Sequence, residues 1–97
     1  MNFGEALEAL KNGRKVARKG WNGYRKGMYI YLTDGREIPE HEWIERSPAQ
    51  ASTITERMNN KVWIAPHIDM VAATGERVIG WLASQTDMLS DDWEIIS

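Results

Sequence analysis

The sequence contains no cysteine, and this absence excludes three kinds of protein at once. Without thiols the chain has no disulfide scaffold, no thiolate metal site and no cysteine nucleophile. No apolar run approaches the roughly 18 residues that a membrane-spanning helix requires. The first residues, MNFGEALEALKNG, also lack the apolar core of a signal peptide. We therefore expect a cytoplasmic protein that does not enter a membrane.

The length of the chain limits how much core it can build. With 97 residues it has room for one domain, so we expect a single ligand-binding domain over 1–97. A chain of this size buries only about 60–65% of the surface that it exposes when unfolded. Association of several copies would be a natural supplement to so modest a core.

Charge is distributed unevenly along the chain, although the net charge is only −2. Residues 1–36 hold eight Lys and Arg against three acidic residues, whereas residues 37–97 hold four against eleven. Seven positive charges and no negative one lie between Lys11 and Lys26. Such a cluster either binds anions or pairs with the acidic remainder when the chain folds. The acidic remainder argues against a long nucleic acid as the partner.

The first residues predict a short amphipathic helix. Asn2 can cap it, with Glu5 as the capping-box partner, and Gly13 is placed to end it. From Phe3 onward the apolar residues follow the i, i+3, i+4, i+7 spacing of one buried helix face.

Most of the remaining chain favours β-structure. Strands are predicted at 15–18, 28–32, 36–38, 62–65, 68–72, 77–81 and 93–96. Asp34-Gly35 is predicted to be a hairpin turn, 40–46 a helical turn and 47–60 a loop or insertion. The chain therefore predicts an α+β fold, with an N-terminal helix packed on an antiparallel sheet of about five or six of these strands. One short helix is expected near the C-terminus, following Ser84.

Two segments have the composition of a small-molecule site. Residues 19–27, KGWNGYRKG, combine glycines with basic side chains, so their N–H groups and cations can approach a phosphate; the alternative is a plain hairpin loop. Ser84, Gln85, Thr86 and Asp87 offer hydroxyl, amide and carboxylate groups for a phosphate or ribose. Simple capping, with Ser84 as N-cap and Asp87 three residues on, explains the same residues.

Metal and catalytic sites find little support. His67-Ile68-Asp69 offers two possible ligands, but neither it nor His41 has the spacing of a recognised zinc site, so we expect no metal. The carboxylates of Glu40, Glu42, Glu45, Asp91 and Asp92 stand in polar contexts and are expected to be solvated. No G-x-S-x-G or other nucleophile signature occurs. We therefore expect a binding protein rather than an enzyme.

Both ends of the chain carry a motif that is similar to a known family. The opening NFGEALEALKNGRKVARKGWNG and the closing WLASQTDMLSDDWEII resemble the two signature ends of a small phage-encoded domain family. That family includes the second type of Thoeris anti-defence protein. The resemblance covers about residues 2–32 and 62–96, in the same order and at the same chain length.

The resemblance implies a sponge for a signalling molecule. Members of the family bind cyclic ADP-ribose isomers such as glycocyclic ADP-ribose, which bacterial TIR-domain proteins make, and hold them without degrading them, so that Thoeris is blocked. They are small α+β proteins that assemble as homotetramers, with ligand pockets where subunits meet. For this chain we expect no cofactor. Some relatives hold cyclic oligonucleotides at separate sites. A sponge for cyclic di- or trinucleotides, or a nucleic-acid or protein interaction module, is therefore the alternative function.

A pyrophosphate, ribose hydroxyls and a flat adenine determine what such a site needs. Basic side chains and glycine N–H groups suit the phosphates, an indole ring suits the base, and Ser84 to Asp87 suit the hydroxyls. Phe3 and Trp81 are either pocket walls or core. The expected ligand-binding residues are Arg18, Lys19, Gly20, Trp21, Asn22, Gly23, Trp81, Ser84, Gln85, Thr86 and Asp87.

Overall fold

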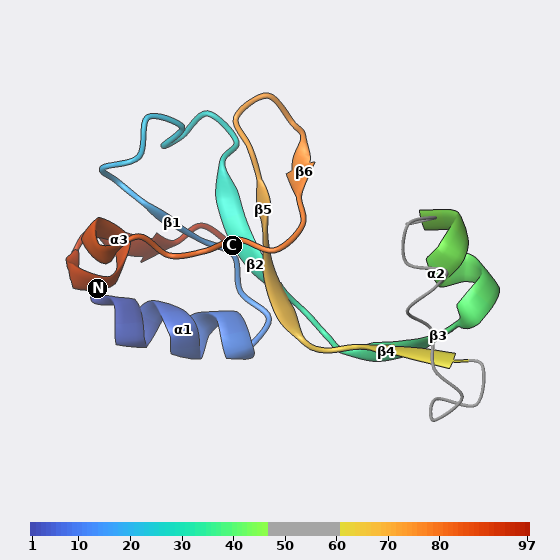
Figure 1. Ribbon diagram of the computed structural model, residues 1–97. Helices are drawn as coiled ribbons and strands as arrows, with labels where there is room; N and C mark the ends of the chain where they lie inside the picture. The colour runs from blue at the N-terminus through green and yellow to red at the C-terminus, as the bar shows by residue number, and fades with distance from the viewer. Residues whose placement is uncertain (47–60) are drawn as a thin grey trace. The chain divides into compact units, whose positions relative to one another are not determined.

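An N-terminal helix, a five-stranded antiparallel sheet and a short C-terminal helix confirm the predicted α+β class (Figure 1). The computed structural model describes residues 1–46 and 61–97. These residues form two compact units, one of Met1–Thr33 with His67–Ser97 and one of Asp34–Pro66. The predicted loop at 47–60 lies outside the described residues, and the single domain over 1–97 stays a prediction.

Helix α1 (Phe3–Lys11) has the two ends that the sequence predicts. The Asn2 side chain accepts from the Glu5 N–H and the Glu5 side chain accepts from the Asn2 N–H, which is a complete capping box. After the helix, Gly13 takes a φ of 79°, a conformation that glycine adopts without a steric penalty. The helix buries Ala6, Ala9 and Leu10 and contacts three strands of the sheet.

The larger sheet has the strand order β6-β5-β2-β1-β7. Its strands are β1 (Val16–Arg18), β2 (Tyr29–Thr33), β5 (His67–Val71), β6 (Arg77–Val78) and β7 (Trp93–Ile95). All neighbours pair antiparallel, and the first and last strands of the chain lie side by side. This pairing sets Arg18 opposite Trp93 and so brings a basic residue to the acidic C-terminal segment.

One face of this sheet and helix α1 enclose the core. Leu10, Val16, Ile30 and Trp93 are at most 1% exposed and form one cluster with the alanines of α1. Helix α3 (Gln85–Leu89) follows Ser84 and also contacts α1. The longest helix within residues 1–46 and 61–97 has nine residues, and no helix in these two ranges is long and apolar enough to cross a membrane.

The second unit is a two-stranded sheet with one helix. Strand β3 (Arg36–Pro39) pairs with β4 (Lys61–Ile64), and α2 (Glu40–Arg46) follows β3 directly. Ile38 is its buried residue, whereas Trp63 is half exposed. Pro39 is the last residue of an edge strand, as its missing N–H requires.

Two details of the predicted β-structure are wrong. Asp34-Gly35 closes no hairpin, because β2 pairs with β1 and β5 while β3 pairs with β4. The strand predicted at 77–81 is only Arg77–Val78, because Gly80 has a φ of 84° and turns the chain away from the sheet. The described residues contain seven strands, five of them in the antiparallel sheet that was expected and two in a second sheet.

Candidate functional site

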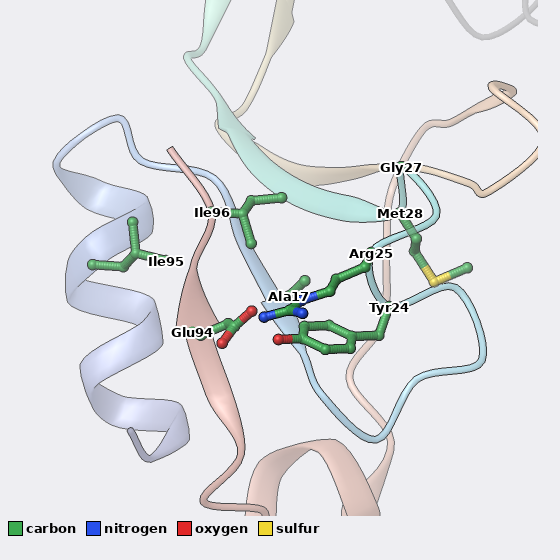
Figure 2. Close-up of a pocket in the computed structure, with 8 residues that line it drawn as sticks. All are labelled: Ala17, Tyr24, Arg25, Gly27, Met28, Glu94, Ile95 and Ile96. Atoms are coloured by element: carbon green, nitrogen blue, oxygen red, sulfur yellow. The ribbon is translucent and has the colours of Figure 1, made fainter.

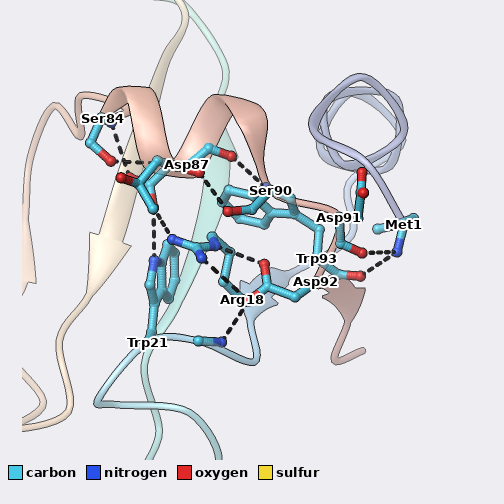
Figure 3. Close-up of polar contacts among 11 residues, drawn as sticks. Met1, Arg18, Trp21, Ser84, Asp87, Ser90, Asp91, Asp92 and Trp93 are labelled. Atoms are coloured by element: carbon cyan, nitrogen blue, oxygen red, sulfur yellow. Dashed lines mark hydrogen bonds and ion pairs between the residues drawn. The ribbon is translucent and has the colours of Figure 1, made fainter.

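Arg18 is the centre of a polar network that joins distant parts of the chain (Figure 3). It is the last residue of β1, and its side chain is 11% exposed. Its Nη1 donates to Asp87 Oδ1 at 2.8 Å, and its Nε donates to Asp92 Oδ1 at 2.8 Å. One guanidinium therefore neutralises two carboxylates, one from α3 and one from the segment before β7.

Asp87 is the most connected acceptor of this network. Its Oδ1 also accepts from Trp21 Nε1 at 3.0 Å, and its Oδ2 accepts from the Ser84 N–H at 3.0 Å. Its main-chain carbonyl accepts from Trp93 Nε1 at 2.9 Å. Through this one residue, α3 is tied to β1, to β7 and to the loop that follows β1.

Asp92 holds the start of the glycine loop. Its Oδ2 accepts from the Gly20 N–H at 2.8 Å while its Oδ1 accepts from Arg18. A Cβ on residue 20 would stand 2.7 Å from this oxygen, so only glycine fits so close to the carboxylate. The sequence-based expectation that Asp92 is solvated is wrong, because antiparallel pairing of β1 with β7 brings it beside Arg18.

The network favours the charged forms of Arg18, Asp87 and Asp92. The hydrogen bond from Arg18 lowers the pKa of Asp92, and the Gly20 N–H adds to the effect. Burial alone would raise the pKa of Asp87, but the bonds from Trp21, Ser84 and Arg18 outweigh it and the pKa is lowered. The bond to Asp92 raises the pKa of Arg18 against the effect of burial.

Three tryptophans pack edge to face beside these charges. The Trp21 ring centroid lies 5.3 Å from that of Trp93 and 6.1 Å from that of Trp81. Trp93 is buried in the core and also contacts Phe3, with ring centroids 5.5 Å apart. Trp21 and Trp81 are half-buried, so they are core residues on one side and surface residues on the other.

The structure brings part of the predicted ligand-binding set together. Arg18, Gly20, Trp21, Trp81, Ser84 and Asp87 form the network and the tryptophan cluster. Lys19, Asn22, Gln85 and Thr86 are exposed next to it. Gly23 is buried, and a Cβ there would stand 2.6 Å from the Met28 Cβ, so packing alone explains this glycine.

Two of the alternatives left open by the sequence can now be described. The Ser84 side chain accepts from the Asp87 N–H, and the Asp87 side chain accepts from the Ser84 N–H, so these two residues form the expected capping box. Arg18 pairs with two carboxylates, and the Lys19 ammonium lies 3.9 Å from Glu94, so these cations pair within the chain. Contact of these residues with a ligand stays a prediction.

The whole chain matches a known protein family. Residues 1–96 match the Thoeris anti-defense 2-like domain. The chain belongs to this family. It is also 37% identical, over 101 aligned residues, to Thoeris anti-defense 2 of Bacillus phage SP01, in an alignment that covers 100% of this chain and 96% of that protein. The resemblance seen at the two ends of the sequence is thereby confirmed.

This member of the Thoeris anti-defense 2-like family also has a cavity that is lined by Ala17 of β1 (Figure 2). The cavity has a volume of about 300 Å³ and lies between the loop that carries Tyr24 and Arg25 and the C-terminal residues Glu94, Ile95 and Ile96. Side chains alternate along a strand, so Ala17 lines this cavity while Arg18 points away from it. None of the expected ligand-binding residues lines it.

The histidine considered as a metal ligand has a carboxylate beside it. His67 Nε2 lies 3.2 Å from Asp69 Oδ2. Within 1–46 and 61–97 no three His, Asp or Glu side chains gather where they would hold a metal ion.

Proposed function

We propose that this chain is an immune-evasion protein that binds a cyclic ADP-ribose-type signal, such as glycocyclic ADP-ribose, and releases it chemically unchanged. Holding the signal in the cytoplasm of an infected cell would block Thoeris defence. The observation that carries this proposal is the match of residues 1–96 to the Thoeris anti-defense 2-like family. The full-length similarity to a phage protein named Thoeris anti-defense 2 supports it.

The network around Arg18 supports a division of labour within the proposed site. Arg18 and Asp87 are each bonded several times inside the fold, so they hold the loop and α3 in place. The exposed side chains of Lys19 and Asn22 then suit a pyrophosphate, whereas the Gly20 N–H is already bonded to Asp92 and Gly23 is buried. The exposed Gln85 and Thr86 suit ribose hydroxyls, and the open side of Trp21 suits the adenine.

A shared site between copies suits the surface of this chain. Leu89, the last residue of α3, is 81% exposed, and Leu82, which precedes α3, is 90% exposed. Apolar side chains so open to water are typical of surfaces that become buried on association. We propose a homotetramer in which a second copy closes the ligand pocket, because enclosure strengthens the polar contacts that tight binding requires.

The decisive experiment measures both binding and the fate of the ligand. Cyclic ADP-ribose isomers are titrated into the protein by calorimetry, the complex is denatured by heat, and the released ligand is identified by chromatography. We expect stoichiometric binding and recovery of unchanged ligand. Loss of ligand over time at substoichiometric protein would overturn sequestration in favour of an enzyme. Absence of binding to every isomer would overturn the proposed ligand and direct the titration to cyclic di- and trinucleotides.

A further inference from the structure

A second buried carboxylate lies outside the Arg18 network. Asp69 on β5 is 2% exposed, and three groups surround it. Thr33 Oγ1 on β2 donates to its Oδ2 at 2.5 Å, and His67 Nε2 lies 3.2 Å from the same oxygen. Its Oδ1 accepts from the Gly80 N–H at 2.7 Å. A charged group so deeply buried in a sheet is expensive to desolvate, and a well-packed apolar residue is often no less stabilising there.

The bond to Gly80 holds the segment that leads to Trp81. Gly80 has a φ of 84°, so the chain turns sharply there after leaving β6. The next residue, Trp81, donates its N–H to the Ile68 carbonyl at 2.6 Å. Two consecutive residues of β5 therefore hold two consecutive residues of the turn, one through a side chain and one through the main chain.

Trp81 is the point where this turn meets the proposed ligand site. Its ring centroid lies 6.1 Å from those of Trp21 and Trp93, in edge-to-face contact with both. Trp21 in turn donates to Asp87 in the Arg18 network. The position of the Trp81 ring therefore sets one side of the tryptophan cluster.

We infer that Asp69 is a positioning residue, which sets the Gly80 turn and thereby aims the Trp81 ring at the ligand site. This inference rests on the proposed function for its ligand but not for its geometry. Asp69 does not touch the ligand site itself. It acts through the 2.7 Å bond that its Oδ1 accepts from the main-chain N–H of Gly80.

Three variants separate positioning from general stability. Asp69→Ala removes the acceptor for the Gly80 N–H. Asp69→Asn keeps a carbonyl oxygen for that N–H, and its NH₂ group can donate to Thr33 Oγ1. Thr33→Val is the matched control, because it removes a bond to Asp69 and leaves the bond to Gly80 in place. Should Asp69→Ala fail to fold, Asp69→Ser replaces it, because its hydroxyl is too short to reach both partners.

The readouts are the indole N–H resonance of Trp81, assigned with Trp81→Phe, and the affinity for glycocyclic ADP-ribose below the melting temperature. We expect Asp69→Ala to shift the Trp81 resonance and to weaken binding about tenfold, since small displacements of site groups are costly. We expect Asp69→Asn to restore both readouts, and Thr33→Val to lower the melting temperature while it leaves both unchanged.

Two results would overturn the inference. One is an unshifted Trp81 resonance in Asp69→Ala, and the other is an equal loss of affinity in Thr33→Val, which would make the effect one of stability. If the wild-type protein binds no isomer, the proposed function fails, and the Trp81 resonances of the same variants still decide whether Asp69 positions the ring.

Discussion

Replacing Asp87 with alanine is the sharpest test of the network that holds the candidate site. The change removes the acceptor for Arg18 Nη1, for Trp21 Nε1 and for the Ser84 N–H. The main-chain carbonyl that accepts from Trp93 is kept. The variant therefore disconnects α3 from β1 and from the loop without disturbing the anchor of the buried Trp93.

The expected loss of stability follows from these three bonds. Hydrogen bonds to a charged group contribute about 1.5–3 kcal/mol each. The side chains of Arg18 and Asp87 are each 11% exposed, so water can reach the vacated space and the lower end applies. The bonds from Arg18 and Trp21 then contribute about 3 kcal/mol together, and the third bond, from the Ser84 N–H, is half of the capping box and contributes about 1 kcal/mol. We expect Asp87→Ala to lower the free energy of unfolding by about 4 kcal/mol, against a total of about 5–15 kcal/mol for a domain of this size.

Urea unfolding followed by circular dichroism measures this loss. At an m-value of about 1–3 kcal/mol per molar urea, the transition midpoint should fall by about 2 M. Arg18→Met and the double variant complete a cycle, in which we expect a coupling energy of at least about 1 kcal/mol. Asp91→Ala is the control, because Asp91 is an exposed carboxylate nearby and its removal should cost less than about 0.5 kcal/mol.

Two outcomes would refute the reasoning behind this prediction. The first is an Asp87→Ala variant within about 1 kcal/mol of the wild type, since the part-buried donors of Arg18 and Trp21 would then have lost their acceptor without consequence. The second is a cycle in which the effects of Arg18→Met and Asp87→Ala are additive, since the pair would then contribute nothing as a pair.

Three further predictions address acid, packing and the ligand. In the folded protein the pKa values of Asp87 and Asp92 lie below the ordinary value of about 3.9, so in acid the unfolded chain binds more protons than the folded one. The stabilisation from these carboxylates should therefore be complete above about pH 5 and be lost as the pH drops below about 4. Urea unfolding at several pH values between 7 and 3 measures this loss. Gly23→Ala should cost about 1–3 kcal/mol of stability, because the new Cβ meets Met28 at 2.6 Å, as thermal unfolding measures. Trp21→Ala should weaken ligand binding by about 1–3 kcal/mol if the ring stacks on the base, as calorimetry measures.

Each of these predictions has its own contrary result. A stability that does not change between pH 5 and 3 contradicts the lowered pKa values. Gly4→Ala is the packing control, because the Cβ of an alanine at this position in α1 meets only Asn2 Oδ1, at 3.4 Å. An equal loss of stability in Gly4→Ala and Gly23→Ala contradicts the clash at residue 23. Trp63→Ala is the control for Trp21→Ala, since Trp63 is a half-exposed indole of the second unit. Unchanged affinity in folded Trp21→Ala would make its ring a core residue alone.

Local signals in the sequence predicted the helices and most strands. Asn2 with Glu5, and Ser84 with Asp87, both form the capping boxes that their spacing indicates, because a cap involves only residues three apart. Gly13 takes a positive φ where the first helix was expected to end. These features depend on neighbouring residues, so a single sequence is enough to find them.

Signals that depend on distant residues were missed or misjudged. Asp92 was expected to be solvated and instead bonds to Arg18, which is 74 positions away. Asp69 alternates with apolar residues in an ordinary strand pattern, and nothing in that pattern shows that Thr33 and Gly80 will surround it. The Asp34-Gly35 hairpin failed for the same reason, since the choice of partner for β2 and β3 depends on the whole chain.

The sequence by itself determined the α+β class, the capped helices and, through two end motifs, the family. Periodicity and capping are short-range properties, and the motifs are read directly from the residues. Only the tertiary structure decided that Arg18 forms ion pairs with both Asp87 and Asp92. The physical reason is that antiparallel pairing of β1 with β7 joins the basic start of the chain to its acidic end, and no local pattern encodes which distant carboxylate a buried guanidinium will meet.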